Sequence, residues 1–320
     1  MQMRAILYIF FTLIPITNLC NHRQAISDDF DIVFQQNLDK TPTGIYSRNQ
    51  WSKDWGNPPW ANGIYTGDLT IIDDFDLGGR SSRAMKWSFP EGSFGANSSH
   101  GYQWHTPLGE KYEEIYLSYS LMFKPGFEPV LGGKIPGLQA SPIKVGIPER
   151  RDGFGGSLMF KEGPKPVFYI YHHDQQGEYG DTREWDYVFN VSSDTWYDIT
   201  FRVVMNTAST DQNFEDTGKK DGIMEGFVNG RLVGQWTGLR LRNISDIGTD
   251  VLRIQAFFGG STEEWASDRE EWMLIDNVFV WTYSDKYLTD HPQVKRGRQV
   301  NTKNAELYTP IDAFLSEDSR

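Results

Sequence analysis

The chain has 320 residues, a formal net charge of −12 and a sequence pI of about 5.0. This acidic balance argues against a nucleic acid partner and against a basic helix that lies on a membrane surface. A single cysteine excludes a disulfide framework, so a large hydrophobic core has to stabilise the fold. Aromatic residues make up 14% of the sequence; we expect most of them in that core and the rest to be available for stacking against sugar rings.

Residues 1–25 are typical of a secretory signal peptide. A short positive start is followed by an apolar stretch at residues 5–16 and then by polar residues. The apolar stretch is too short for a transmembrane helix, so we expect a secreted or periplasmic protein without a transmembrane segment. Cys20 lies in this segment and offers a site for a lipid anchor, and the sequence leaves open whether the protein is free or anchored.

Strand patterns dominate the rest of the chain. Apolar and polar residues alternate in short runs that are separated by Gly, Pro, Asn and Asp. Asn229-Gly230 between two such runs predicts a two-residue β-hairpin. The expected strands lie at 69–72, 83–89, 101–105, 115–123, 157–161, 167–172, 196–205, 223–228, 231–236, 251–258 and 272–281.

About ten strands with almost no amphipathic helix predict an all-β fold, a jelly-roll β-sandwich. Neither an internal repeat nor a domain linker is visible, so we expect one domain over residues 26–285. Residues 286–320 are polar and lack periodicity, which predicts a loosely held C-terminal tail.

A local excess of positive charge contrasts with the acidic chain. Between positions 134 and 165 there are six Lys or Arg and three Asp or Glu, a local charge of +3. Pro and Gly interrupt much of this window, so we expect residues 134–156 to form a long basic loop beside a substrate cleft. A chance cluster in a solvated loop is the alternative.

The motif Gly132-Gly-Lys-Ile-Pro-Gly-Leu138 follows the expected strand at 115–123. Its glycines permit a tight turn and close approach to a ligand, and its proline stiffens the exit. Lys134 is therefore expected to be a positioned cation rather than a solvated surface charge.

Two tyrosines occupy alternate positions on the strand at 167–172. Side chains alternate along a strand, so Tyr169 and Tyr171 share one face, while Phe168 and Ile170 suit the core. A lysine charge near a phenol favours the phenolate and lowers the pKa of the hydroxyl. With Lys134, the two tyrosines form a plausible set for proton transfer.

These motifs resemble polysaccharide lyase family 14, the alginate and glucuronan lyases with a jelly-roll fold. The resemblance covers about residues 83–281 and implies that Lys134, Tyr169 and Tyr171 are catalytic, without a metal or organic cofactor. The further matching segments, in chain order, are Tyr169-Ile-Tyr171-His, Tyr179-Gly-Asp, Trp196 with Val203-Val-Met-Asn206-Thr207, Asp221-Gly-Ile with Phe227-Val-Asn-Gly230, and Phe257-Phe-Gly-Gly-Ser261 with Trp265-Ala.

The reaction that the resemblance implies is β-elimination on a 1,4-linked polyuronate, alginate or glucuronan. Lys134 would neutralise the substrate carboxylate so that the C5 proton becomes acidic. One tyrosine would take that proton and one would return a proton to the leaving O4. Tyr169 is favoured as the base, and the reverse assignment stays open.

The sequence departs from the family pattern at one position. The family carries Ser-x-Arg with the arginine twelve residues before the first tyrosine, but Gly155-Gly-Ser157 stands there in this chain. A carboxylate-binding arginine is therefore missing from its place, and Arg150 or Arg151 in the upstream loop are candidates to replace it. The other candidates for substrate binding are Gln103, His105, Ser157 and His172.

Three other interpretations compete with a lyase. His172-His173-Asp174 suggests a metal site, but adjacent residues on a strand point to opposite faces and no second cluster has ligand spacing, so no metal is expected. Asp276 and the pair Glu263-Glu264 do not supply the two facing acids that a glycosidase needs. A carbohydrate-binding jelly roll that has lost catalysis remains the alternative, favoured by the replaced Ser-x-Arg. The sequence gives no oligomeric state.

Overall fold

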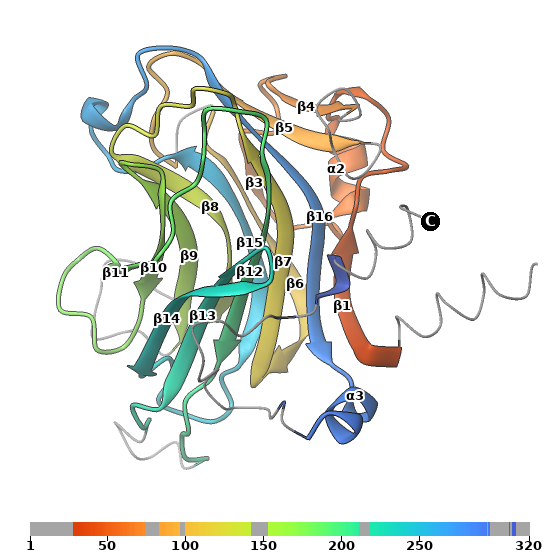
Figure 1. Ribbon diagram of the computed structural model, residues 1–320, viewed down its shortest axis with the longest axis vertical. Coiled ribbons are helices and arrows are strands. Elements are labelled where there is room, and N and C mark those ends of the chain that lie inside the picture. The colour runs from red at the N-terminus through yellow and green to blue at the C-terminus, as the bar shows by residue number, and fades with distance from the viewer. Residues whose placement is uncertain are drawn as a thin grey trace, which may run out of the picture.

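The computed structural model describes residues 28–73, 83–96, 100–141, 153–210 and 218–292, together with 294, 307 and 309–311. Two antiparallel sheets of nine and seven strands pack against each other (Figure 1). This arrangement confirms the all-β jelly-roll sandwich expected from the strand patterns. In the described part of the chain, no helix is long and apolar enough to cross a membrane.

The larger sheet carries nine strands. Its hydrogen-bonded order is β14 (Arg231–Leu239), β13 (Gly222–Val228), β12 (Trp196–Val204), β7 (Glu114–Phe123), β16 (Glu271–Tyr283), β5 (Ala84–Phe89), β4 (Leu69–Ile72) and β2 (Gly44–Ile45), and β1 (Phe30–Gln36) pairs with β16.

The smaller sheet carries the candidate site. Its order is β11 (Asp181–Glu184), β10 (Lys165–Tyr171), β9 (Phe154–Lys161), β8 (Gly132–Ala140), β15 (Thr249–Phe258), β6 (Tyr102–Tyr112) and β3 (Ala61–Asn62). The short helices are α2 (Arg48–Asp54), the 3-10 helix η3 (Glu263–Trp265) and α3 (Asp285–Asp290).

The core lies between the two sheets, and the period-two pattern decides which side chains enter it. The alternate residues of β7 from Ile115 to Phe123 are buried in one cluster with Phe168 and Ile170 of β10. The rings of Phe168 and Phe201 from the facing sheet have centroids 5.9 Å apart. The expected inward faces of these strands are confirmed.

The turn between β13 and β14 is also confirmed. Asn229 and Gly230 have φ angles of 49° and 75°, the left-handed values that a two-residue type I′ hairpin requires. In contrast, β1, β11 and α2 were not expected from the sequence. The chain beyond β16 forms α3, and Ile311 is fully buried against the outer aromatic cluster that contains Trp281.

The Gly-Gly-Lys-Ile-Pro-Gly-Leu motif forms strand β8 rather than a turn, which corrects the loop expected from residue 134 onward. Its glycines serve close strand packing: a Cβ on Gly137 would overlap the Gly156 carbonyl oxygen. The β8–β9 register shifts between Ile135 and Leu138. Pro136 lies in this irregular stretch, where a missing backbone N–H is tolerated.

Several expectations lie outside the described residues. Positions 142–152 of the expected basic loop are among these, and so are Arg150 and Arg151. The signal peptide at 1–25 with Cys20 and most of the segment 286–320 also lie outside the described residues.

Candidate active site

One face of the seven-stranded sheet, turned away from the core, gathers most of the candidate residues. Each candidate alternates along its strand with a core residue, as Lys134 does with Ile135 and Ser157 with Leu158. We call this surface the site face. It carries Tyr169 and Tyr171 from β10, Ser157 and Met159 from β9, Lys134 from β8, Arg253 and Gln255 from β15, and Gln103 and His105 from β6.

The two tyrosine hydroxyls are in direct contact. Tyr169 Oη and Tyr171 Oη are 3.0 Å apart, and the backbone N–H of Gly180 donates to Tyr169 Oη at 3.1 Å. Their rings meet edge to face with centroids 5.4 Å apart. The predicted side-by-side arrangement of the two hydroxyls is therefore present.

The pKa of the Tyr169 hydroxyl is raised above 10.0, not lowered as the sequence reasoning expected. Burial is the largest cause, and the hydrogen bond to Tyr171 adds to it. The Tyr169 hydroxyl therefore keeps its proton at neutral pH.

Lys134 lies beside this pair. Its Nζ is 2.8 Å from the centre of the Tyr169 ring and donates to Met159 Sδ at 3.1 Å. The side chain is buried, and burial lowers the pKa of its ammonium well below 10.5. The positive charges of Arg253 and Lys161 lower this pKa further. A carboxylate bound nearby would favour the charged form of this amine.

Arg253 is a member of the site face that the sequence reasoning missed. Its backbone pairs with Gly137 on β8 and with His105 on β6, which places it near the middle of the sheet. Burial lowers the pKa of its guanidinium to about 10, while Tyr171 and then Tyr169 act in the opposite direction. The guanidinium therefore remains a cation at neutral pH, close to both tyrosines.

The other predicted residues on the site face contact their immediate neighbours. Ser157 is 2% exposed and pairs with Tyr169 across the β9–β10 ladder. Gln103 donates to the Ala96 carbonyl at 2.8 Å. The ring centroid of His105 lies 4.8 Å from that of the half-exposed Trp60, and burial, with the charge of Arg253, lowers the histidine pKa to about 4. His105 is therefore neutral at neutral pH.

His172 does not join the site face. Its ring lies 5.9 Å from Trp236, whose ring also packs against Phe168 on the core side of β10. His172 Nε2 pairs with Asp181 at 2.9 Å. These contacts give His172 a structural setting on the far side of the strand from Tyr171. No cluster of metal-ligating side chains occurs among the described residues.

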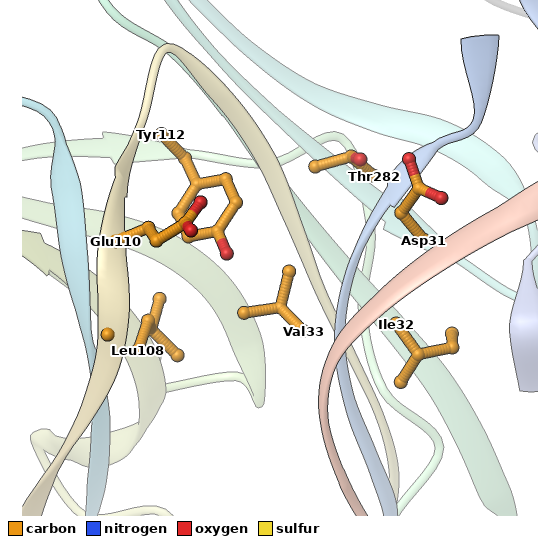
Figure 2. Close-up of a pocket in the computed structure, with 8 residues that line it drawn as sticks. Asp31, Ile32, Val33, Leu108, Glu110, Tyr112 and Thr282 are labelled. Atoms are coloured by element: carbon orange, nitrogen blue, oxygen red, sulfur yellow. The ribbon is translucent and has the colours of Figure 1, made fainter.

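Two pockets lie away from the site face. Figure 2 shows one between β1 and β6, with a volume of about 610 Å³, whose lining includes the carboxylates of Asp31 and Glu110. A second pocket, beside the β9–β10 hairpin, is lined by Lys161, Lys165 and Glu184 among others. Neither contains a predicted site residue, and the acidic pocket has the wrong sign for a polyuronate.

Comparisons with known proteins identify the family and the fold. The family model of polysaccharide lyase 14 matches residues 78–278, whereas comparison with curated proteins gives no match. The alginate lyase Aly36B aligns in three dimensions with a TM-score of 0.61 and 20% identity, over 77% of this chain and 95% of that one.

Two further alginate lyases have the same fold. The marine PL-14 alginate lyase from Aplysia kurodai gives a TM-score of 0.58 and 18% identity, over 78% of this chain and 98% of that one. The alginate lyase vAL-1 from Chlorella virus gives a TM-score of 0.52 and 16% identity, over 82% of this chain and 97% of that one. At these identities the likeness shows the fold, while the family model spans more than half of the chain. The protein belongs to the polysaccharide lyase 14 family.

Proposed function

We propose that the protein is a secreted polysaccharide lyase that cleaves a 1,4-linked polyuronate, alginate or glucuronan, by β-elimination. The observation that carries the proposal is the meeting of one lysine and two phenols on a single face: the hydroxyls of Tyr169 and Tyr171 are 3.0 Å apart, and Lys134 Nζ is 2.8 Å from the Tyr169 ring centre. Family membership and the alginate lyases of the same fold support the substrate class.

The first step needs a neutralised substrate carboxylate. The C5 proton of a uronate becomes acidic when the charge that develops on the carboxylate is stabilised. We assign this task to Lys134, since binding of a carboxylate beside it raises the pKa of its amine and restores its charge. Substrate binding and protonation of Lys134 are then coupled.

The two tyrosines divide the proton transfers. Tyr169 keeps its proton at neutral pH, which suits it to act as the acid. The elimination then needs Tyr171 in its phenolate form: the phenolate takes the C5 proton, and the C5–H electron pair forms the C4=C5 double bond. The C4–O4 bond breaks, and Tyr169 gives its proton to O4. This assignment reverses the one favoured from the sequence, where Tyr169 was the base.

The contact between the two hydroxyls also provides a way to reset the site. After one turnover Tyr171 carries the proton and Tyr169 has lost one. A single transfer across the 3.0 Å hydrogen bond restores the starting state. The cycle thus needs no proton acceptor beyond the pair.

An assay for the unsaturated product tests the proposal. Purified protein is incubated with polymannuronate, polyguluronate and glucuronan while ultraviolet absorbance follows formation of the double bond. We expect absorbance to rise with at least one polymer. Binding of a polyuronate without any rise would instead identify the carbohydrate-binding jelly roll that the replaced Ser-x-Arg suggested.

A further inference from the structure

We propose that Arg253 binds the uronate carboxylate, in place of the arginine that the family pattern carries on the strand before the tyrosines. The inference rests on the proposed function and names a binding residue of the same site. Position 157, where the family carries its arginine, holds a serine here. The positive charge reaches the same face from β15, two strands away.

The surroundings of Arg253 orient its guanidinium. The Gln255 amide faces Arg253, and only its oxygen can accept hydrogen bonds from a cation that has donors alone. In that orientation the oxygen accepts from Nε and Nη2 at 2.7 Å each, and the amide nitrogen donates to Ser157 Oγ at 3.3 Å. Gln255 thus links the guanidinium to the position where the family arginine is expected.

The geometry of β8 allows this link to form. Ser157 and Gln255 belong to strands on either side of β8, and their side chains meet across it. Gly137 of β8 pairs with Arg253, and because it is a glycine it places no side chain between Ser157 and Gln255. The glycine of the motif therefore leaves space for Gln255 to reach Ser157.

One nitrogen of the guanidinium is left without a partner. Arg253 Nη1 is buried and has no hydrogen bond to any described residue, and no ion pair of Arg253 occurs in the described part of the chain. Two more deeply buried arginines differ: Arg202 pairs with Glu225 at 2.6 Å and Arg242 with Glu113 at 2.6 Å. Arg253 is partly buried, and a cation that has lost part of its hydration without gaining a counter-ion is stabilised by a ligand that supplies the anion.

A polyuronate supplies that anion. The charge of Arg253 lowers the pKa of Lys134 and of His105, and the two tyrosines raise the pKa of Arg253. The guanidinium therefore lies among the proposed proton-transfer residues. A guanidinium keeps its charge and offers a directed N–H to a carboxylate. Arg253 is then the permanent cation of the site, and Lys134 is the cation that substrate binding restores.

Calorimetric titration with a short oligouronate tests the proposal without depending on turnover. Arg253→Gln is measured in a Tyr169→Phe background, so that the ligand is not consumed, together with Arg253→Lys. Arg231→Gln, which removes an exposed arginine of β14, is the matched control. We expect Arg253→Gln to weaken binding about 10- to 100-fold, Arg253→Lys to fall between it and the parent, and the control to bind as the parent does.

The outcomes separate the two proposals. Unchanged affinity of Arg253→Gln overturns the role of Arg253, even where the wild-type protein is an active lyase. If Arg253→Gln binds as the parent does but loses activity, Arg253 acts on the tyrosine pair instead, and its role in binding is overturned. Weakened binding in a protein that cuts no polyuronate supports Arg253 and rejects the lyase. If Arg253→Gln fails to fold, parental affinity in Arg253→Lys overturns the proposal.

Discussion

The Tyr169 and Tyr171 hydroxyls share a 3.0 Å hydrogen bond on the face of β10 opposite the core. Tyr169 also accepts the Gly180 N–H, which fixes the position of its oxygen. The raised pKa of the Tyr169 hydroxyl keeps it protonated at neutral pH. In the proposed elimination Tyr169 is therefore the acid and Tyr171 the base.

We predict different behaviour for the two tyrosine variants. Tyr169→Phe and Tyr171→Phe should each lower kcat about 100- to 10,000-fold, the usual contribution of a general acid or base. Only Tyr169→Phe should recover with a substrate whose leaving group at C4 needs no proton. Steady-state rates on a polyuronate and on an activated disaccharide measure this difference, and recovery of Tyr171→Phe instead would reverse the assignment.

Removal of the Lys134 amine should abolish most of the activity. In Lys134→Met the substrate carboxylate loses the cation that stabilises the developing charge, so kcat should fall about 100- to 1,000-fold. Lys165→Met removes a half-exposed lysine that pairs with Glu184, and it should retain wild-type rates. Product absorbance gives both rates; equal rates in the two variants would rule out Lys134.

Trp60 should contribute to substrate binding at the edge of the sheet. Its ring is 42% exposed and its centroid lies 4.8 Å from that of His105 on the site face. Trp60→Ala should raise KM several-fold with little change in kcat, because stacking acts on bound substrate and transition state alike. Tyr65→Ala, which removes another exposed ring, is the control. A fall in kcat alone would contradict this role.

Stability should depend on pH through His105. Its folded pKa of about 4 lies below the ordinary 6.5, so the folded state favours the neutral ring. The resulting stabilisation is present above pH 6.5 and is lost as the pH falls toward 4. Between pH 7 and pH 4 the wild type should lose about 1–3 kcal/mol more unfolding free energy than His105→Gln. Denaturant titrations of both proteins at pH 7 and pH 4 measure this difference. Equal losses of unfolding free energy in the wild type and in His105→Gln would contradict the prediction.

A substitution in the nine-stranded sheet should lower stability without changing the activity of the site. Arg202 is 2% exposed and pairs with Glu225 and Glu114 at 2.6 and 2.9 Å. Arg202→Leu leaves two carboxylates without their cation and should lower the unfolding free energy by about 3–5 kcal/mol. The kcat of the folded fraction should be that of the wild type. A loss below 1 kcal/mol would show that water or neighbouring groups compensate.

Local alternation made much of the fold predictable. The strand at 115–123 and the two tyrosines on one face follow directly from the period of two, since each inward residue is large and apolar. The Asn229-Gly230 hairpin follows from its turn chemistry. Strand β8 was mistaken for a turn because its Gly and Pro residues satisfy contacts with neighbouring strands that no local pattern reveals.

The composition of the site was harder to predict than its catalytic residues. Arg253 is far from Lys134 in the sequence, and only the order β9-β8-β15 brings it to the same face. A signal was present: Arg253 and Gln255 alternate with core residues on the strand that ends in the matching Phe-Phe-Gly-Gly segment. His172 was predicted to bind substrate, but it directly follows Tyr171, and its ring lies on the opposite side of β10, 5.9 Å from Trp236, as alternation along a strand implies.

The most direct test compares the wild type, Lys134→Met and the Tyr169→Phe/Tyr171→Phe double variant on polymannuronate, polyguluronate and glucuronan. We predict that the wild type generates the ultraviolet-absorbing double bond on at least one of these polymers and that both variants, still folded, do not. An inert wild type on all three, or variants that cut as fast as the wild type, would contradict it.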